Sequence, residues 1–560
     1  MKPIQERIAE QIISALQRTV ERGEAAGLLA WEARPPITLE TPKDPSHGDL
    51  ATNLAMAGAR LARVAPRKLA EIIVEHFDPA GTAVEKVEIA GPGFINFRLS
   101  DTWLAEAVAD VLAAGPDYGR SQHGAGRRIN LEFVSANPTG PMVMVQARAG
   151  AVGDVLAGCL AWAGWDVVSE YYLDDMGTQV ETLGRSVEIR LRQALGEDIP
   201  FPEGAYPGIY VIEIAKRATQ EFGRELLERP EAERQQVLAD YAVGIIAAQQ
   251  KEQLDRYRVH FDVWFSQKSL VETGYVDRAL RALEERGAIF EEDGAKWIRT
   301  TSYGDDKDRV LVRSNGEPSY FLLDIAYHLN KMDRGFDHLI DIWGPDHHGH
   351  IQRMMAAMSA LGLQGKLEIV ISQMVRVYSG GELVRMSKRA GDFVTMEEVV
   401  DEVGVDACRF FFLMRALETH MDFDLDLAKL NTNENPVYYV QYAHARMCGI
   451  LRQAAESGLQ LLPPNRVDLG RLTEEAEKSL IKKLAALPGE IVAAAEGREP
   501  HRLPRYAQEL AAAFHVFYDR CRVLTDDPGL TQARLALVRA SQICLANVLG
   551  LLKVSAPERM

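Results

Sequence analysis

The chain has 560 residues, of which 47% are hydrophobic and 26% are charged. At the usual domain size this length predicts about three or four domains, and the composition excludes collagen-like, low-complexity and disordered proteins. The formal net charge of −17 excludes a protein that coats nucleic acid by bulk charge, although a local basic face is still compatible with it.

No run of residues approaches the roughly 18 consecutive apolar residues of a membrane span, so we expect no membrane association. The N-terminal segment mixes acidic and basic residues in an amphipathic pattern, unlike a signal peptide. The five cysteines form no C-x-x-C pair, which argues against a zinc ribbon or a thioredoxin-type redox site. Reduced thiols are typical of the cytoplasm, which is the expected location.

Residues 1–120 predict a small N-terminal α/β module. Apolar periodicity indicates helices at 4–18, 54–62 and 67–77 and strands at 84–90 and 94–99. A polar, glycine-containing linker at 121–128 separates this module from the next domain.

Residues 121–405 alternate between strand and helix patterns, which is typical of a Rossmann-type domain with a parallel sheet. The expected strands are 129–134, 166–172, 310–313, 338–343 and 367–377, and the expected helices are 141–163, 177–195, 319–330 and 350–361. Mostly helical sequence at about 180–290 predicts an insertion. From 406 to 560 the pattern is helical throughout, which predicts a C-terminal all-α bundle and a multidomain α/β protein overall.

The first candidate site is the turn Ser135–Gly140, which follows a buried strand and precedes Pro141. Proline favours the first position of a helix, where free N–H groups and the helix dipole attract anions. Neither a P-loop nor a dinucleotide fingerprint is present. An ordinary capped turn would give the same pattern, so an anion site and a structural turn both remain open.

The second candidate is a basic loop between two glycines, Gly381 and Gly391. It contains Arg385, Lys388 and Arg389 within five residues. Such a loop suits closure on phosphates, although a solvated basic loop would look the same.

The third candidate is the segment after the strand 338–343, which contains Gly344, Asp346 and three histidines. The carboxyl edge of a parallel sheet is where such folds bind ligands. Metal-ligand spacings such as H-E-x-x-H are missing, so polar contacts to a sugar or nucleotide are favoured over a metal. No protein-bound metal is expected.

The fourth candidate is Asp324, which lies in the apolar run 318–328. A carboxylate in such surroundings is costly unless it is paired. It therefore predicts either an internal ion pair with an arginine or lysine, or a receptor for a cationic ligand.

Together these segments resemble class I aminoacyl-tRNA synthetases, and specifically arginyl-tRNA synthetases of the bacterial type. The matching segments follow in order along the chain: SANPTGP (135–141), EYYLDDMGTQV (170–180), PSYFLLDIAYHLNK (318–331), WGPDHHGH (343–350), RMSKRAGDFVTMEEVVDEVGVDACRFFFL (385–413), NPVYYVQYAHAR (435–446) and the C-terminal LTQARLALV and VSAPERM.

The resemblance implies an N-terminal module that contacts the tRNA elbow, a catalytic domain and an anticodon-binding helical domain. It implies that arginine and ATP give arginyl-adenylate and pyrophosphate, and that the arginyl group then passes to the 3′-terminal ribose of the tRNA for arginine. Magnesium accompanies the ATP, activation requires bound tRNA, and the chain is expected to be a monomer.

The resemblance also implies roles for individual residues. The catalytic residues are expected to be Lys388 and Arg385, and Gln146, which stands where the family has histidine, is hypothesised to join them as a replacement donor. The ATP-binding residues are expected to be Pro138, Gly140, Gly344, Asp346, His347, Met386, Ser387 and Lys388. Tyr320 and Asp324 are expected to bind the guanidinium of arginine, and Asn137, Tyr171 and Gln352 to complete that pocket. Rings expected to stack on anticodon bases, or to be helix core, are Tyr438, Tyr439, Tyr442, Phe514, His515, Phe517 and Tyr518.

One element departs from the family pattern. The family has His-x-Gly-His at the helix start, where this chain has Val143, Met144, Val145 and Gln146. Valine cannot hydrogen-bond a phosphate through its side chain, whereas glutamine donates a neutral hydrogen bond. The chain is therefore either an active synthetase with a variant phosphate grip, or a catalytically impaired, synthetase-like regulator that binds tRNA or arginine. An unrelated nucleotidyl transferase or metal hydrolase is the third alternative.

Overall fold

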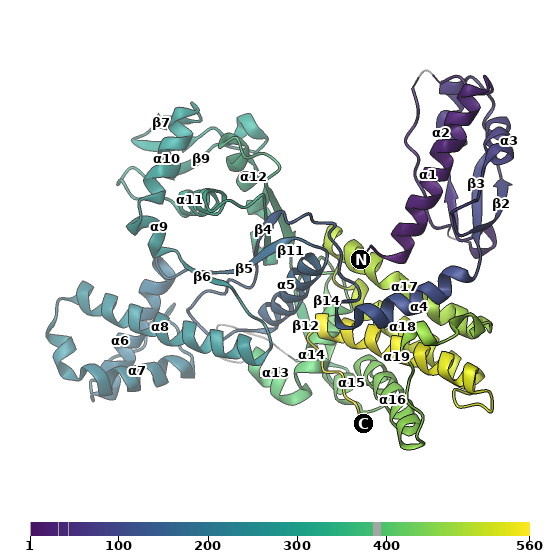
Figure 1. The fold of residues 1–560 in the computed structure, drawn as a ribbon. Coiled ribbons are helices and arrows are strands. Elements are labelled where there is room, and N and C mark those ends of the chain that lie inside the picture. Colours follow the sequence, from purple (N-terminus) through teal and green to yellow (C-terminus); the bar gives the residue numbers. More distant parts are fainter. Residues whose placement is uncertain (1, 32, 43, 385–393) are drawn as a thin grey trace.

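The computed structural model describes residues 2–31, 33–42, 44–384 and 394–560 (Figure 1). Residues 385–393 of the predicted phosphate-binding loop lie outside the described residues, and they include Arg385, Met386, Ser387, Lys388, Arg389 and Gly391.

The N-terminal module is α/β, as predicted, but its antiparallel sheet has three strands where the sequence predicted two. Its elements are α1 (Ile4–Ala25), β1 (Leu50–Thr52), α2 (Leu54–Ala62), α3 (Pro66–His76), β2 (Val84–Ala90) and β3 (Phe94–Leu99), and the strand order is β1-β3-β2. One face of α1 buries Ile8, Ile12 and Leu16 in the module core. Strand β1 was not predicted, because three residues are too few to show an alternating pattern.

Helix α4 (Thr102–Ala114) falls within residues 1–120 but packs on the C-terminal helices α17 (Glu475–Glu496) and α19 (Pro528–Leu551) (Figure 1). The Asn547 side-chain amide donates to the carbonyl oxygens of Gly115 and Tyr118, at 3.0 Å each. The chain after β3 therefore packs with the far end of the sequence as well as with α1, to which the Arg7–Asp110 ion pair joins it at 2.9 Å.

The central domain contains a five-stranded sheet in the order β11-β10-β4-β5-β6, in which every neighbouring pair is parallel. The strands are β4 (Arg128–Glu132), β5 (Asp166–Leu173), β6 (Val263–Ser266), β10 (His338–Trp343) and β11 (Leu367–Ile371). This arrangement confirms the predicted Rossmann-type domain. The chain runs from β4 towards β6 on one side and from β10 towards β11 on the other, so the loops after β4 and β10 diverge and leave a crevice.

The predicted helical insertion at about 180–290 is shorter in the structure. Helices α6 (Thr178–Ala194), α7 (Ile209–Phe222) and α8 (Glu231–Arg256) form the insertion, and β6 then returns to the main sheet. Helices α9 (Lys268–Glu272) and α10 (Tyr275–Glu285) lead to a small antiparallel sheet of β7 (Ile289–Glu292), β8 (Ala295–Ile298) and β9 (Arg309–Val312). Helices α11 (Tyr320–Asp333) and α12 (Ile351–Ala360) flank β10 in sequence.

A second small sheet joins the catalytic domain to the C-terminal region. It consists of β12 (Val375–Ser379), β13 (Glu382–Val384) and β14 (Met421–Asp424), with α13 (Met396–Val403), α14 (Val405–Leu413) and α15 (Leu425–Lys429) close in sequence. The predicted single strand 367–377 is wrong, because it divides into β11 and β12. The prediction of helix alone after 406 is also wrong, because β14 alternates buried and exposed residues and pairs with β12.

The C-terminal region is a helical bundle, as predicted. It consists of α16 (Pro436–Glu456), α17, α18 (Arg502–Arg520) and α19. Helix α19 is the one helix of the described chain that is long and apolar enough to cross a membrane, with a mean hydropathy of 1.3 over its most apolar window. Because 67% of that window is buried against the rest of the protein, α19 is the core helix of the bundle.

Close packing of α5 (Met144–Trp162) on Phe133, the residue after β4, generates a stability prediction. A Cβ atom at Gly153 would lie 2.3 Å from Cγ of Phe133. Gly153→Ala should therefore overpack this contact, at a cost of about 1–3 kcal/mol, and lower the midpoint of thermal unfolding by several degrees. The matched control is Gly244→Ala in exposed α8, where a Cβ meets no atom within 4 Å and alanine favours the helix. Equal midpoints for the two variants would show that a methyl group at Gly153 fits beside Phe133 without destabilising the fold.

Candidate active site

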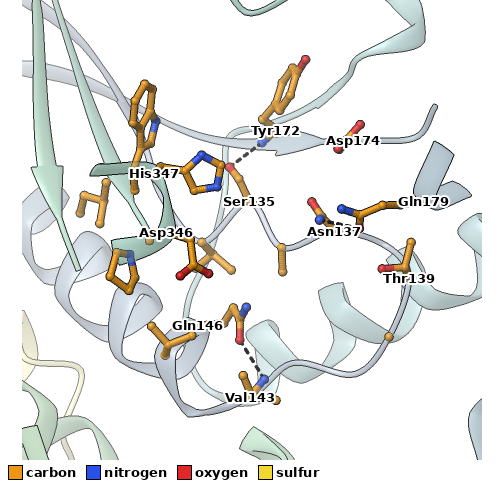
Figure 2. A pocket seen from close by; sticks show the side chains of 18 of the residues that line it. Ser135, Asn137, Thr139, Val143, Gln146, Tyr172, Asp174, Gln179, Asp346 and His347 are labelled. Carbon is orange, nitrogen blue, oxygen red and sulfur yellow. Dashed lines mark hydrogen bonds between the residues drawn. The ribbon is translucent and has the colours of Figure 1, made fainter. Parts of the chain in front are cut away.

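A cavity of about 600 Å³ opens at the carboxyl edge of β4, β5 and β10, where the loops diverge. Its walls come from the turn after β4, the start of α5, the end of β5 and the loop after β10 (Figure 2). Helix α11 supplies a further wall. Parallel-sheet proteins bind ligands at this position.

The turn after β4 is held in an uncommon backbone conformation. Val134 and Ser135 both have positive φ, of 69° and 35°, and this is unfavourable for a β-branched residue such as valine. The Ser135 hydroxyl donates to Glu132 Oε1 at 2.9 Å and accepts the Tyr172 N–H at 3.1 Å. These bonds fix the turn and direct the following loop into the cavity (Figure 2).

A buried ionic cluster holds α11 against β4 and β10. Lys331 Nζ lies 2.6 Å from Glu132 Oε2 and 2.8 Å from Asp341 Oδ1, and His328 Nε2 lies 2.8 Å from Asp341 Oδ2. Burial opposes ionisation of Asp341, but the charges of Lys331 and His328 outweigh it and lower its pKa to about 2. Burial likewise disfavours charged Lys331, yet the surrounding carboxylates raise its pKa. The Lys331–Asp341 pair is therefore ionised, whereas burial raises the pKa of Glu132, and the cluster holds α11 in place beside the cavity.

Helix α11 presents two polar residues to the cavity one turn apart, Tyr320 and Asp324. The helix begins at Tyr320 because the Ser319 side chain caps it, accepting the Leu322 N–H. Within the described residues the Asp324 carboxylate forms no hydrogen bond or ion pair, and burial raises its pKa to about 7. The expected alternative of an internal ion pair is therefore wrong for the described chain, and the receptor for a cationic ligand remains.

The loop after β10 lines the opposite wall. Gly344, Asp346 and His347 all line the cavity, and the His347 ring packs 5.9 Å from Trp343 and 5.3 Å from His350. Burial lowers the pKa of His347, and it lowers the pKa of His350 to about 4, so both imidazoles are neutral at pH 7. Neutral imidazole and carboxylate groups suit hydrogen bonds to sugar hydroxyls.

Across the described ranges, no group of three or more His, Cys, Asp or Glu residues is arranged to hold a metal ion. Glu132, which lines the cavity, and the fully buried Asp341 already pair with Lys331.

Helix α5 begins at Met144 and not at Pro141, so that part of the anion-site prediction is wrong. The preceding residues are extended, because the Met142 carbonyl accepts the Met396 N–H at 2.9 Å and Val143 forms a bridge with Thr395. Gln146 Oε1 accepts the Val143 N–H at 3.0 Å (Figure 2). This bond orients the glutamine and leaves its amide N–H groups as donors at the cavity wall.

Most of the predicted binding residues meet in this cavity. Those that line it are Asn137, Gly140, Gln146, Tyr320, Asp324, Gly344, Asp346 and His347. Pro138 is buried within the turn and does not line it. Asn137 is oriented by Gln179, whose Oε1 accepts its side-chain N–H at 2.9 Å.

Two predicted arginine-binding residues lie elsewhere. Tyr171 is fully buried on the other face of β5, where its hydroxyl lies 2.9 Å from the Ala136 carbonyl oxygen and supports the turn. Gln352 donates to the Gly304 carbonyl at 2.6 Å, outside the cavity lining. The residue that faces the cavity from β5 is Tyr172, because successive strand residues point to opposite faces.

The sequence interpretation missed several lining residues, which are Glu132, Ser135, Tyr172, Asp174, Gln179 and His328. Strand alternation would have identified Tyr172 and Asp174, which both lie on the cavity side at the end of β5. Glu132 and His328 carried no sequence signal, since their role depends on the packing of α11.

Comparison with known proteins agrees with this fold. Three family models match successive parts of the chain: the arginyl tRNA synthetase N-terminal domain at 5–99, the class I (R) tRNA synthetase catalytic domain at 107–411 and the DALR anticodon-binding domain at 440–560. The architecture and the catalytic-domain match are those of a class I aminoacyl-tRNA synthetase.

Full-length relatives give the family. The chain is 52% identical over 558 residues to the arginine–tRNA ligase of Symbiobacterium thermophilum, covering all of both chains. It is 48% identical over 556 residues to that of Bacillus subtilis, covering 99% of this chain and 100% of the relative. The chain belongs to the arginyl-tRNA synthetase family. The fold is shared with the Thermus thermophilus arginyl-tRNA synthetase structure, with a TM-score of 0.72 at 23% identity over 99% of this chain and 100% of that one. Nothing in these matches favours the regulator alternative.

The unpaired carboxylate of Asp324 generates a stability prediction. Its pKa is about 7 in the folded chain and near 3.9 when unfolded, so the free energy of unfolding should fall as pH rises from about 4 to 7. Asp324→Asn removes this penalty and should raise the midpoint of thermal unfolding at pH 8 by a few degrees, with little change at pH 4. The exposed Asp526→Asn is the control. A lower midpoint for Asp324→Asn at pH 8 would mean that the carboxylate belongs to a stabilising pair.

Proposed function

We propose that this chain activates L-arginine with ATP and transfers the arginyl group to the 3′-terminal ribose of the tRNA for arginine. The observation that carries the proposal is the unpaired Asp324 carboxylate in the cavity, since a guanidinium is the cation that supplies parallel donors to such a group. The family indicates which reaction the chain catalyses, and the residues that line the cavity support binding of both arginine and ATP there.

In the activation step an oxygen of the arginine carboxylate attacks the α-phosphorus of ATP. A new O–P bond forms, the bond to the β-phosphate breaks, and pyrophosphate leaves. The nucleophile belongs to the substrate, so the protein has to position two anions and stabilise the charge between them. In the second step a hydroxyl of the terminal ribose attacks the arginyl carbonyl carbon and AMP leaves.

The cavity offers separate regions for the two substrates. Asp324 and Tyr320 would bind the guanidinium, with Asn137 near the amino-acid end. Asp346 and His347 would bind the ribose of ATP, and Gly344 leaves room beside it because a Cβ there would meet no atom within 4 Å. Magnesium would arrive with the ATP phosphates.

Phosphate binding is the part of the mechanism that differs from the family pattern. The Gln146 amide and the free N–H groups of the first turn of α5 would replace the two missing imidazoles. Lys388 would supply positive charge, with Arg385 at the start of its loop and Met386 and Ser387 shaping it. Two lost hydrogen bonds to charged groups would cost about 3–6 kcal/mol without compensation, which is roughly a 10²–10⁴-fold loss of rate.

The tRNA would bind to the C-terminal bundle and to the N-terminal module. Tyr442 and Tyr518 lie on the surface of the bundle with the Arg446 guanidinium between them, at 4.9 and 4.8 Å from the ring centres. Tyr518 is exposed and Tyr442 is half-buried, and rings that solvent reaches beside a cation suit stacking on unpaired bases. Phe514 and Phe517 are fully buried, so they belong to the helix core. We also expect the chain to act as a monomer in the cytoplasm.

The test is arginine-dependent ATP–pyrophosphate exchange by the full-length chain with ATP, magnesium and unmodified tRNA for arginine. Exchange should require arginine, should not occur with lysine, and should depend on the tRNA. Gln146→Ala should lower the exchange rate by about 10–100-fold while leaving the KM for arginine unchanged, because its amide lines the cavity and in this proposal would donate to the phosphates and not to arginine. Lys388→Ala should nearly abolish exchange.

Tight binding of tRNA by the unmodified chain with no detectable adenylate would reject the proposal and favour the regulator. If the Gln146→Ala variant exchanges at the parent rate, the proposed activity is retained, but Gln146 has no role in binding the phosphates.

A further inference from the structure

Two adjacent aspartates at the end of β5 have opposite environments. Asp175 is buried and fully engaged: it accepts the Ser266 hydroxyl hydrogen and, at 3.0 Å, the Lys268 backbone N–H. Asp174 lines the cavity, on the same side as Tyr172 (Figure 2). Asp175 therefore stabilises the fold, and Asp174 is available to a ligand.

The hydrogen-bonding capacity of Asp174 is largely unused. Among the described residues it accepts one side-chain hydrogen bond, from the Tyr320 hydroxyl to Oδ2 at a long 3.3 Å, and its buried Oδ1 has no donor. A carboxylate can accept about four hydrogen bonds, and burying it unsatisfied costs free energy. The site is thus incomplete without a donor from a ligand.

Asp174 and Asp324 act on each other across the cavity. Burial raises the pKa of Asp174 to about 6, and the charge of Asp174 adds to the burial that raises the pKa of Asp324 to about 7. Neither carboxylate pairs with a lysine or arginine of the described chain. Two unneutralised carboxylates facing one cavity create a strong preference for a cation between them.

The hydroxyl of Tyr320 links the two groups. Tyr320 lies one turn before Asp324 on α11 and donates to Asp174 on β5, so it joins both walls at the cavity. A guanidinium is planar and has five N–H donors, more than one carboxylate can accept. A second carboxylate at its other edge satisfies the remaining donors, whereas the ammonium of lysine cannot reach both acceptors with the same geometry.

We infer that Asp174 is a second receptor for the guanidinium of arginine, acting with Asp324, and that the pair selects arginine over lysine. This inference rests on the proposed function of the same cavity. Asp174 touches the substrate directly, so its loss should weaken arginine binding without affecting ATP. A site built around paired donors and acceptors discriminates strongly, because the wrong substrate leaves buried groups unpaired.

The experiment compares Asp174→Asn with the parent chain in aminoacylation, with the KM for arginine and for ATP measured separately. The KM for arginine should rise about 10–100-fold, and the KM for ATP should stay within about threefold. Asp175→Asn is the matched control. This variant removes the hydrogen-bond acceptor at Asp175, next to Asp174, so it should lower the midpoint of thermal unfolding. The ratio of the KM for arginine to the KM for ATP should stay within about threefold of the parent ratio.

Asp174→Glu is the second variant, for the case that Asp174→Asn does not fold. It keeps the charge but moves the carboxylate by one methylene, and the KM for arginine should rise about 3–10-fold. Folded Asp174 variants with the parent KM for arginine would overturn the inference. If the parent does not charge tRNA, the proposed function is wrong. The role of Asp174 is then tested by calorimetry, which compares the Kd for arginine of the parent with that of the Asp174 variants.

Discussion

Lys331 is a single lysine buried between helix α11 and strands β4 and β10, and the geometry of the site depends on its two ion pairs. Its partners are Glu132 at the end of β4 and Asp341 in β10, and His328 completes the cluster from the same helix. Glu132 also accepts the Ser135 hydroxyl, so the same cluster supports the strained turn after β4. Removing one partner of a buried pair costs about 3–5 kcal/mol, and here it would also release the turn that carries Asn137.

The cluster allows other charges nearby to remain unpaired. With α11 fixed, Asp324 is held in the cavity without a partner, and Asp174 faces the same space with one weak donor. Both unpaired groups destabilise the fold, and the fold alone already holds both in position to meet a cation. Because the fold already holds the carboxylates in place, little free energy is lost in ordering them when the substrate binds. The substrate provides the hydrogen-bond donors that the protein lacks, which favours arginine over other ligands.

Features that depend on local sequence patterns were predicted correctly. Features that depend on how distant elements pack were not. Alternation of strands and helices predicted the parallel sheet, and the apolar run around Asp324 was enough to single out that carboxylate. Tyr171 was preferred to Tyr172 because the register of β5 against the cavity was not used. Pro141 suggested a helix start, but pairing with Thr395 and Met396 keeps that segment extended, and no local signal shows a contact across about 250 residues. Asp174 was missed because its neighbour Asp175 has the same chemistry and only the fold separates them.

The most direct test of the account is the number of protons released when arginine binds to the full-length chain. Calorimetry at pH 6.5 in two buffers of different ionisation enthalpy gives this number. With pKa values of about 7 and about 6 for Asp324 and Asp174 in the empty cavity, a bound guanidinium should drive both to the ionised form. Arginine binding should then release about one proton at pH 6.5 and close to none at pH 8.5. Binding with no proton release at pH 6.5 would show that these carboxylates are already ionised or do not contact the guanidinium, and would contradict the account.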